Sequence, residues 1–205
     1  MTDEIRSVLA LFAGRGFDVR TFVTAAQMRA AVLDAVPAGC SAGFGGSVTC
    51  QWALDLPQGL LDKGCTVYSH WRTPASQDPD IFRKENSADV FFTSCNAITL
   101  DGQLMNNDGF GNRLSAICYG PGEVYFLAGI NKFVPDYSAG MERIRHTAYP
   151  KNVQRLHEKA PCAGSGACIH CAKKLCETSG FTLSVTHPAQ GRPFHLWVAE
   201  ESMGF

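Results

Sequence analysis

Four cysteines near the C-terminal end form the densest set of reactive side chains in the sequence. Cys162, Cys168, Cys171 and Cys176 follow one another in the pattern Cys-x5-Cys-x2-Cys-x4-Cys. Thiols this close together are expected to be deprotonated and held by a metal, because thiolate is the form of cysteine that binds metals. Four thiolates suit zinc or an iron–sulfur cluster. We therefore predict that residues 160–180 form a metal-binding arm.

The cysteine spacing favours a [4Fe–4S] cluster over zinc. Structural zinc ribbons usually carry two Cys-x2-Cys pairs far apart in sequence, whereas this stretch has one such pair, Cys168 and Cys171, within a continuous segment. There are two alternatives to the cluster: a zinc site, or four reduced thiols that bind no metal. The remaining five cysteines are scattered among mostly apolar residues and are expected to be buried as small hydrophobic side chains. They are Cys40, Cys50, Cys65, Cys95 and Cys118.

A glycine-rich turn, residues 43–49, lies between a predicted strand and a predicted helix. The main-chain N–H groups of Gly45 and Gly46, with the helix N-terminus, can hold a carboxylate or phosphate. Ser47 can cap the helix and also bond to a ligand. The spacing matches neither the Rossmann fingerprint nor a P-loop, so it does not predict a dinucleotide. Alternatively, the glycines only permit close packing and Ser47 only caps.

A polar loop is predicted within residues 96–113, after one strand and before a helix. In open α/β sheets, ligands bind beyond the carboxyl ends of the strands. Arg113 can clamp a carboxylate and Asp108 can move a proton, which suits a hydroxy acid, a keto acid or a sugar. Alternatively, the polar side chains only cap the loop's own backbone. The substrate-binding candidates in this segment are Asn96, Asn106 and Asn112.

Asn131 and Lys132 directly follow the most apolar predicted strand, residues 123–130. Lys132 can reach an anion at the sheet edge, opposite the glycine turn, and Asn131 is a further candidate to bind substrate. The alternative is a lysine that only faces solvent. The predicted catalytic residues are thus Asp108, Arg113 and Lys132.

Helical and strand patterns alternate along the chain. This alternation predicts a single α/β domain with a mostly parallel sheet that helices flank on both faces, and Thr24 and Gln27 form a capping box. Residues 71–80 are predicted to be a loop. The expected helices cover residues 5–12, 24–36, 47–61, 112–118, 137–148 and 152–159. The expected strands cover residues 17–23, 40–44, 66–69, 89–94, 123–130, 182–186 and 193–199, with a hairpin at 97–105.

Charge and hydropathy exclude several classes of partner. The formal net charge of the 205 residues is −1 and the basic residues are scattered, so nucleic acid is not an expected ligand. No apolar run approaches the roughly 20 residues that cross a bilayer, so no membrane association is expected. The acidic start of the sequence lacks a signal-peptide pattern, and we expect a cytoplasmic protein.

Together these motifs resemble the lactate-utilisation (LUD domain) family, in the branch with a C-terminal cysteine cluster. The resemblance covers most of the chain and includes the cysteine stretch. Its other matching segments are residues 45–49, 89–134, 143–145 and 201–205. It implies a fold like those of ribose-5-phosphate isomerase, glucosamine-6-phosphate deaminase and the CoA transferases. It also implies a link to the oxidation of lactate to pyruvate, alongside iron–sulfur partner proteins.

The leading functional hypothesis is an iron–sulfur oxidoreductase, or a subunit of one, acting on a small 2-hydroxy or 2-oxo acid. No flavin or nicotinamide motif is visible, so an iron–sulfur or electron-transfer partner protein would exchange the electrons. One alternative is a non-redox isomerase or lyase with a structural or Lewis-acid metal. Another is a binding module that senses a metabolite or redox state. The expected ligand is a small carboxylic acid or a sugar-like molecule, and a homo-oligomer is compatible with the sequence.

Overall fold

A six-stranded parallel sheet forms the centre of the protein, seen here in a computed structural model that describes residues 1–171, 176 and 180–205. Its strands are β1 (Asp18–Phe22), β2 (Ser41–Phe44), β3 (Thr66–Tyr68), β4 (Val90–Thr93), β7 (Glu123–Gly129) and β10 (Phe194–Ala199). They lie in the order β1-β10-β7-β4-β2-β3, and every adjacent pair is parallel. The predicted α/β fold with a mostly parallel sheet is confirmed.

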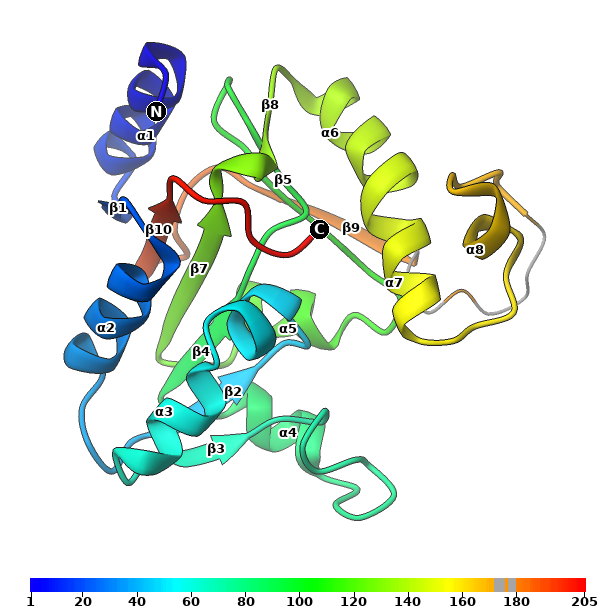
Figure 1. Cartoon of the computed structure of the whole chain (residues 1–205). Coiled ribbons are helices and arrows are strands. Elements are labelled where there is room, and N and C mark those ends of the chain that lie inside the picture. Colours follow the sequence, from blue (N-terminus) through cyan, green and yellow to red (C-terminus); the bar gives the residue numbers. More distant parts are fainter. Residues whose placement is uncertain (172–175, 177–179) are drawn as a thin grey trace.

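Helices lie on both faces of this sheet (Figure 1). The helices are α1 (Asp3–Gly14), α2 (Ala25–Ala35), α3 (Leu56–Asp62), α4 (Ile81–Asn86), α5 (Asn112–Cys118), α6 (Tyr137–Arg143), α7 (Tyr149–Arg155) and α8 (Pro161–Ser165). Shorter helical turns are η1 (Thr49–Ala53), η2 (Ile130–Lys132) and η3 (Ile144–Ala148). The capping box of Thr24 and Gln27 starts α2 as predicted. Within the described residues, no helix combines the length and apolar character needed to cross a membrane.

Side chains that point alternately to the two faces of the parallel sheet form one apolar core on each face. In β7, Val124 and Phe126 pack with α1 and α5 on one face, whereas Tyr125 and Leu127 pack with α2 and α3 on the other. Strands buried on both faces carry near-continuous apolar runs because both sets of side chains leave water. This explains the uninterrupted apolar character of β4 and β7.

A second, separate sheet has four strands and carries several of the polar residues of the predicted polar loop. It comprises β8 (Phe133–Val134), β5 (Ala97–Thr99), β6 (Leu104–Asp108) and β9 (Phe181–Val185), in that order. β5 and β6 form the predicted antiparallel hairpin, which turns at Gly102 with φ +88°. β9 pairs with β6, so it lies in a different sheet from β10.

The structure corrects several predicted elements. The helix predicted over residues 47–61 is broken between η1 and α3, because Pro57 lacks the N–H needed to continue the helical hydrogen bonds, and Asp55 takes φ 42° there. Helix α4 was not predicted, since it is short and its two adjacent apolar residues show no helical period. Asn106 belongs to strand β6 and not to a loop. Cys118 is exposed instead of buried.

The described part of the cysteine arm packs against α7 and η3, and Figure 1 shows α8 on the outer side of α7, away from the parallel sheet. Gln154 Nε2 donates a hydrogen bond to the carbonyl of Ala163 at 2.9 Å, and Cys168 N donates to the carbonyl of Arg145 at 2.9 Å. Residues 172–175 and 177–179 of the predicted arm lie outside the described residues. The arm is therefore attached to both α7 and η3.

Phe126→Ala tests the assignment of the core. Phe126 is fully buried in β7, so losing its ring should lower the free energy of unfolding by about 3–5 kcal/mol. Tyr119→Ala is the control, because that ring is 86% exposed and its loss should change the free energy by less than about 0.5 kcal/mol. Urea unfolding measures both, and equal losses would contradict the assignment.

Candidate functional site

The loops at the carboxyl ends of the parallel strands surround a pocket of about 370 Å³. The glycine turn follows β2, residues 94–96 follow β4, and Lys132 comes shortly after β7. Parallel strands end at the same edge of a sheet, which is where ligands bind in open α/β folds. The end of β6, the start of α5 and helix α7 supply the remaining walls.

Eight of the ten predicted site residues outside the cysteine arm line this pocket. They are Gly45, Gly46, Ser47, Asn96, Asp108, Asn112, Arg113 and Lys132. Asn106 is not part of the lining; it is fully buried, and its side chain has no hydrogen-bond partner among the described residues. Asn131 also lies outside the lining. Its Oδ1 accepts a hydrogen bond from Met203 N at 3.0 Å and its Nδ2 donates to the carbonyl of Gly204 at 3.4 Å.

The glycine turn allows two side chains to approach the pocket closely. A Cβ on Gly45 would lie 2.9 Å from Cγ of Arg113. Gly46 has φ +69°, and a Cβ there would lie 3.0 Å from Nε2 of His70. Ser47 Oγ accepts a hydrogen bond from the main-chain N–H three residues later at 3.2 Å, so it caps the turn that follows. The packing and ligand-binding interpretations of this motif are therefore compatible.

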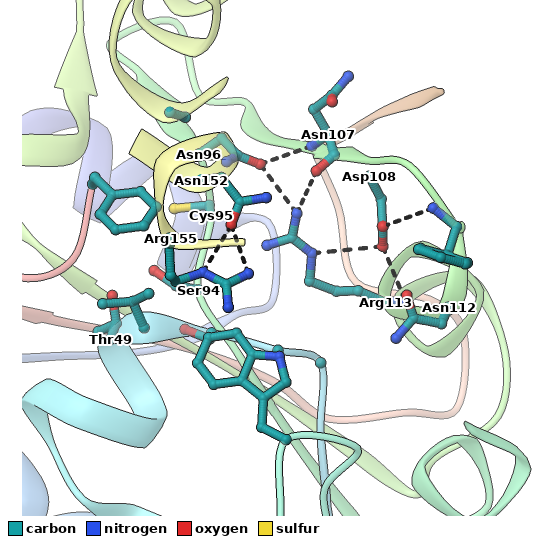
Figure 2. A pocket seen from close by; sticks show the side chains of 18 of the residues that line it. Thr49, Ser94, Cys95, Asn96, Asn107, Asp108, Asn112, Arg113, Asn152 and Arg155 are labelled. Atoms are coloured by element: carbon teal, nitrogen blue, oxygen red, sulfur yellow. Dashed lines mark hydrogen bonds and ion pairs between the residues drawn. The ribbon is translucent and has the colours of Figure 1, made fainter. Parts of the chain in front are cut away.

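Arg113 is fixed in the pocket by several hydrogen bonds (Figure 2). Its Nη2 donates to Asn96 Oδ1 at 3.2 Å and to the carbonyl of Asn107, and its Nε lies 3.9 Å from Asp108 Oδ2. The Asp108 carboxylate also accepts from the main-chain N–H groups of Phe110 at 3.2 Å and Arg113 at 3.1 Å. Asp108 thus stabilises the start of α5 and only partly offsets the charge of Arg113.

Lys132 is a buried cation, with 2% of its surface exposed. Its Nζ donates a hydrogen bond to the main-chain oxygen of Phe205, and no carboxylate side chain among the described residues pairs with it. Burial, together with the nearby charges of Arg143, Arg113 and Lys151, lowers the pKa of Lys132 to about 7. The ammonium form is therefore destabilised, because desolvation and like charges both disfavour it.

Arg155 is a third cation of the pocket, and the sequence analysis did not identify it. Its Nε and Nη2 donate to Asn152 Oδ1 at 3.0 and 2.8 Å, and its guanidinium lies 4.3 Å from the ring centroid of Trp71. Burial lowers the pKa of Arg155. Within the described part of the chain, no carboxylate forms an ion pair with it. Figure 2 shows Arg155 and Arg113 extending from two different helices toward the same space.

His70 and Glu85 form an oriented pair that was also missed. Glu85 is 1% exposed, and its Oε1 accepts from His70 Nδ1 at 2.7 Å and from His70 N at 2.6 Å. With the carboxylate as acceptor, Nδ1 is the donor of this bond, and in the neutral ring Nε2 is then a proton acceptor that faces the glycine turn. The buried carboxylate fixes both the tautomer and the orientation of the ring.

Two buried polar atoms of the lining have no hydrogen-bond partner among the described residues. They are Ser94 Oγ and Asn107 Oδ1. Buried polar groups are almost always satisfied, so these two atoms are positioned to bond to a ligand or to water. A hydroxyl can donate or accept, whereas the amide oxygen only accepts.

The cysteines of the arm lie near one another but do not form a closed site. Burial raises the pKa of Cys162, and the neighbouring thiols of Cys168, Cys176 and Cys171 raise it further. In the part of the chain that the structure describes, no three His, Cys, Asp or Glu side chains are arranged to hold a metal ion. By its chemistry, the four-thiol donor set fits zinc or an iron–sulfur cluster.

Comparisons with known proteins agree with this architecture. The LUD domain family model matches residues 6–180. The crystal structure of a DUF162 family protein from Deinococcus radiodurans is similar in fold, with a TM-score of 0.52 and 13% identity, over 97% of this chain and 99% of that chain. No curated protein matches the sequence.

Replacing Arg155 should weaken anion binding without unfolding the protein. Arg155→Met removes a cation whose hydrogen bonds stay within its own helix. A hydrogen bond to a charged group contributes roughly 1.5–3 kcal/mol, so titration with pyruvate or phosphate should show about ten- to a hundredfold weaker binding. Arg6→Met is the control, because its side chain is 63% exposed. Unchanged affinity in the Arg155 variant would rule out this residue as an anion ligand.

The stability of the protein should depend on pH through Lys132. Its pKa is about 7 in the folded chain and roughly 10.4 in an unfolded chain, so the unfolded state binds more protons between these values. The wild type should therefore gain stability relative to Lys132→Met as pH rises from 7, by up to about 1.4 kcal/mol per pH unit. Denaturant midpoints at several pH values measure this difference, with exposed Lys159→Met as the control. A difference that stays constant with pH would refute the prediction.

Proposed function

The chain belongs to the LUD domain family, and on this premise we propose that its pocket binds a small 2-hydroxy or 2-oxo acid. The main support is the excess of cations: Lys132, Arg113 and Arg155 line the pocket, and among the described residues Asp108 is the single carboxylate side chain in the lining. Asp108 already bonds to the start of α5, so the pocket keeps a net positive charge. The volume of about 370 Å³ suits a small ligand.

Each group has a specific role in this proposal. Arg155 and Arg113 bind the carboxylate of the substrate, since a planar guanidinium matches it in shape and charge. Lys132 bonds to the oxygen on the adjacent carbon. His70, oriented by Glu85, accepts the proton of a substrate hydroxyl. Oxidation of a 2-hydroxy acid to a 2-oxo acid releases two electrons and two protons, and the electrons pass to an acceptor.

We propose that Cys162, Cys168, Cys171 and Cys176 hold a [4Fe–4S] cluster, with zinc as the alternative. A cluster bound there would supply single-electron transfer. An iron–sulfur or electron-transfer partner protein would then receive the electrons. The four-thiol donor set supports this proposal, as does the attachment of the arm to α7, the helix that carries Arg155.

A non-redox isomerase or lyase is the second candidate function. The oriented His70–Glu85 pair and the buried amine of Lys132 favour it, because proton transfer by these groups needs no electron acceptor. In that case the metal of the arm would be structural or a Lewis acid. A binding module that senses a metabolite would use the same cations without turnover.

An assay with and without an electron acceptor distinguishes these functions. Anaerobically purified protein is incubated with L-lactate or glycolate and a one-electron dye. Oxidation of the acid that requires the dye, and that is lost in Arg155→Met, is the result expected of the oxidoreductase. Conversion of the substrate without the dye would overturn the redox proposal in favour of the isomerase or lyase.

Replacing one arm cysteine should remove the metal. Cys171→Ser leaves three thiolates and should lose most bound iron or zinc, because metal affinity depends on the full ligand set. Cys118→Ser is the matched control, since both cysteines are exposed. Metal analysis and the absorption spectrum of anaerobic samples measure the effect; a cluster absorbs broadly at about 400 nm, whereas zinc is colourless. Full metal content in Cys171→Ser would disprove the ligand assignment.

A further inference from the structure

Lys132 has the surroundings of a reactive amine and not only of an anion ligand. Its side chain is 2% exposed and reaches the pocket from the turn after β7. The hydrogen bond from Nζ goes to the main-chain oxygen of Phe205. A lysine that only binds an anion does so best in its charged form. The surroundings of Lys132 instead disfavour the charged ammonium form.

Groups from several elements contribute to the electrostatic environment of Lys132. Arg143 on α6, Arg113 on α5 and Lys151 on α7 each disfavour a further positive charge, and the thiol of Cys95, after β4, acts in the opposite sense. With burial, these groups bring the pKa of Lys132 to about 7. A large share of the amine is therefore neutral near neutral pH, and the neutral amine is the nucleophile.

Other polar groups line the same pocket as this amine. Arg113 and Arg155 lie on helices at other sides of the pocket and would hold the carboxylate of a 2-oxo acid. The unpaired Ser94 hydroxyl lies in the same lining, next in sequence to Cys95. It can exchange a proton with the oxygen that leaves the carbonyl carbon.

We propose that Lys132 forms an imine with the carbonyl carbon of a 2-oxo acid bound in the pocket. The Nζ lone pair attacks the carbonyl carbon, the amine nitrogen gives up its two protons, and the oxygen takes up two protons and leaves as water. One N–C double bond replaces the C–O double bond, without any oxidant or reductant. This inference rests on the proposed 2-oxo acid ligand and adds covalent capture to it.

Reductive trapping tests the imine directly. The full-length protein is incubated with pyruvate and borohydride, which converts an imine into a stable secondary amine. Intact mass should increase by one reduced pyruvyl group, and peptide mapping of the wild type should place it on Lys132. Lys132→Met should lose the adduct, whereas Lys151→Arg should retain it. Arg155→Met should lower the yield by about tenfold at limiting pyruvate, because it weakens the binding that precedes attack.

Binding and trapping are measured separately, so their failures are distinguishable. Calorimetric binding of pyruvate without an adduct on Lys132 would overturn the imine and leave the proposed ligand intact. No binding and no adduct would overturn both. Equal labelling of Lys132 and exposed lysines would also overturn the imine, since it would show no selective reactivity. Because mapping uses the wild-type protein, the result does not depend on the folding of Lys132→Met.

Discussion

Burial of positive charge without a matching carboxylate is the constraint on which the site depends. Lys132 is 2% exposed, and burying an ammonium costs several kcal/mol unless a partner offsets the loss of water. Two apolar cores, one on each face of the parallel sheet, supply the stability that permits this arrangement. The strand ends are thus free to carry polar groups that are incompletely paired within the protein. A bound anion would pair with them, so binding and local stability are linked.

The pocket and the cysteine arm depend on the same helix. Arg155 and Asn152 on α7 face the pocket, while Gln154 on the same helix bonds to the arm at Ala163. Cys168 is anchored to the preceding turn at Arg145. A change in the arm, such as binding of a metal, would therefore act on the element that positions Arg155. This arrangement gives a physical route between the two sites without requiring them to touch.

Much of the fold and part of the site were predictable because they follow from local rules. Strand–helix alternation indicated the parallel sheet, and the rule that strand ends share an edge grouped Lys132 with Arg113 and the glycine turn. The remaining residues depend on tertiary contacts. His70 acquires an orientation only through Glu85, on a helix too short to predict, and Arg155 reaches the pocket only because α7 folds back over it. Asn131 precedes Lys132 directly, yet it bonds to the C-terminal residues, since adjacency in sequence does not fix the direction of a side chain.

The central claim is that the pocket binds the carboxylate and the adjacent oxygen of a small 2-oxo acid. A crystal structure of the protein with oxamate, an unreactive analogue of pyruvate, tests it most directly. We expect the oxamate carboxylate within hydrogen-bond distance of the guanidinium of Arg155 or Arg113, and its amide oxygen facing Nζ of Lys132. Oxamate bound elsewhere, or a pocket that stays without oxamate at saturating concentration, would contradict the account.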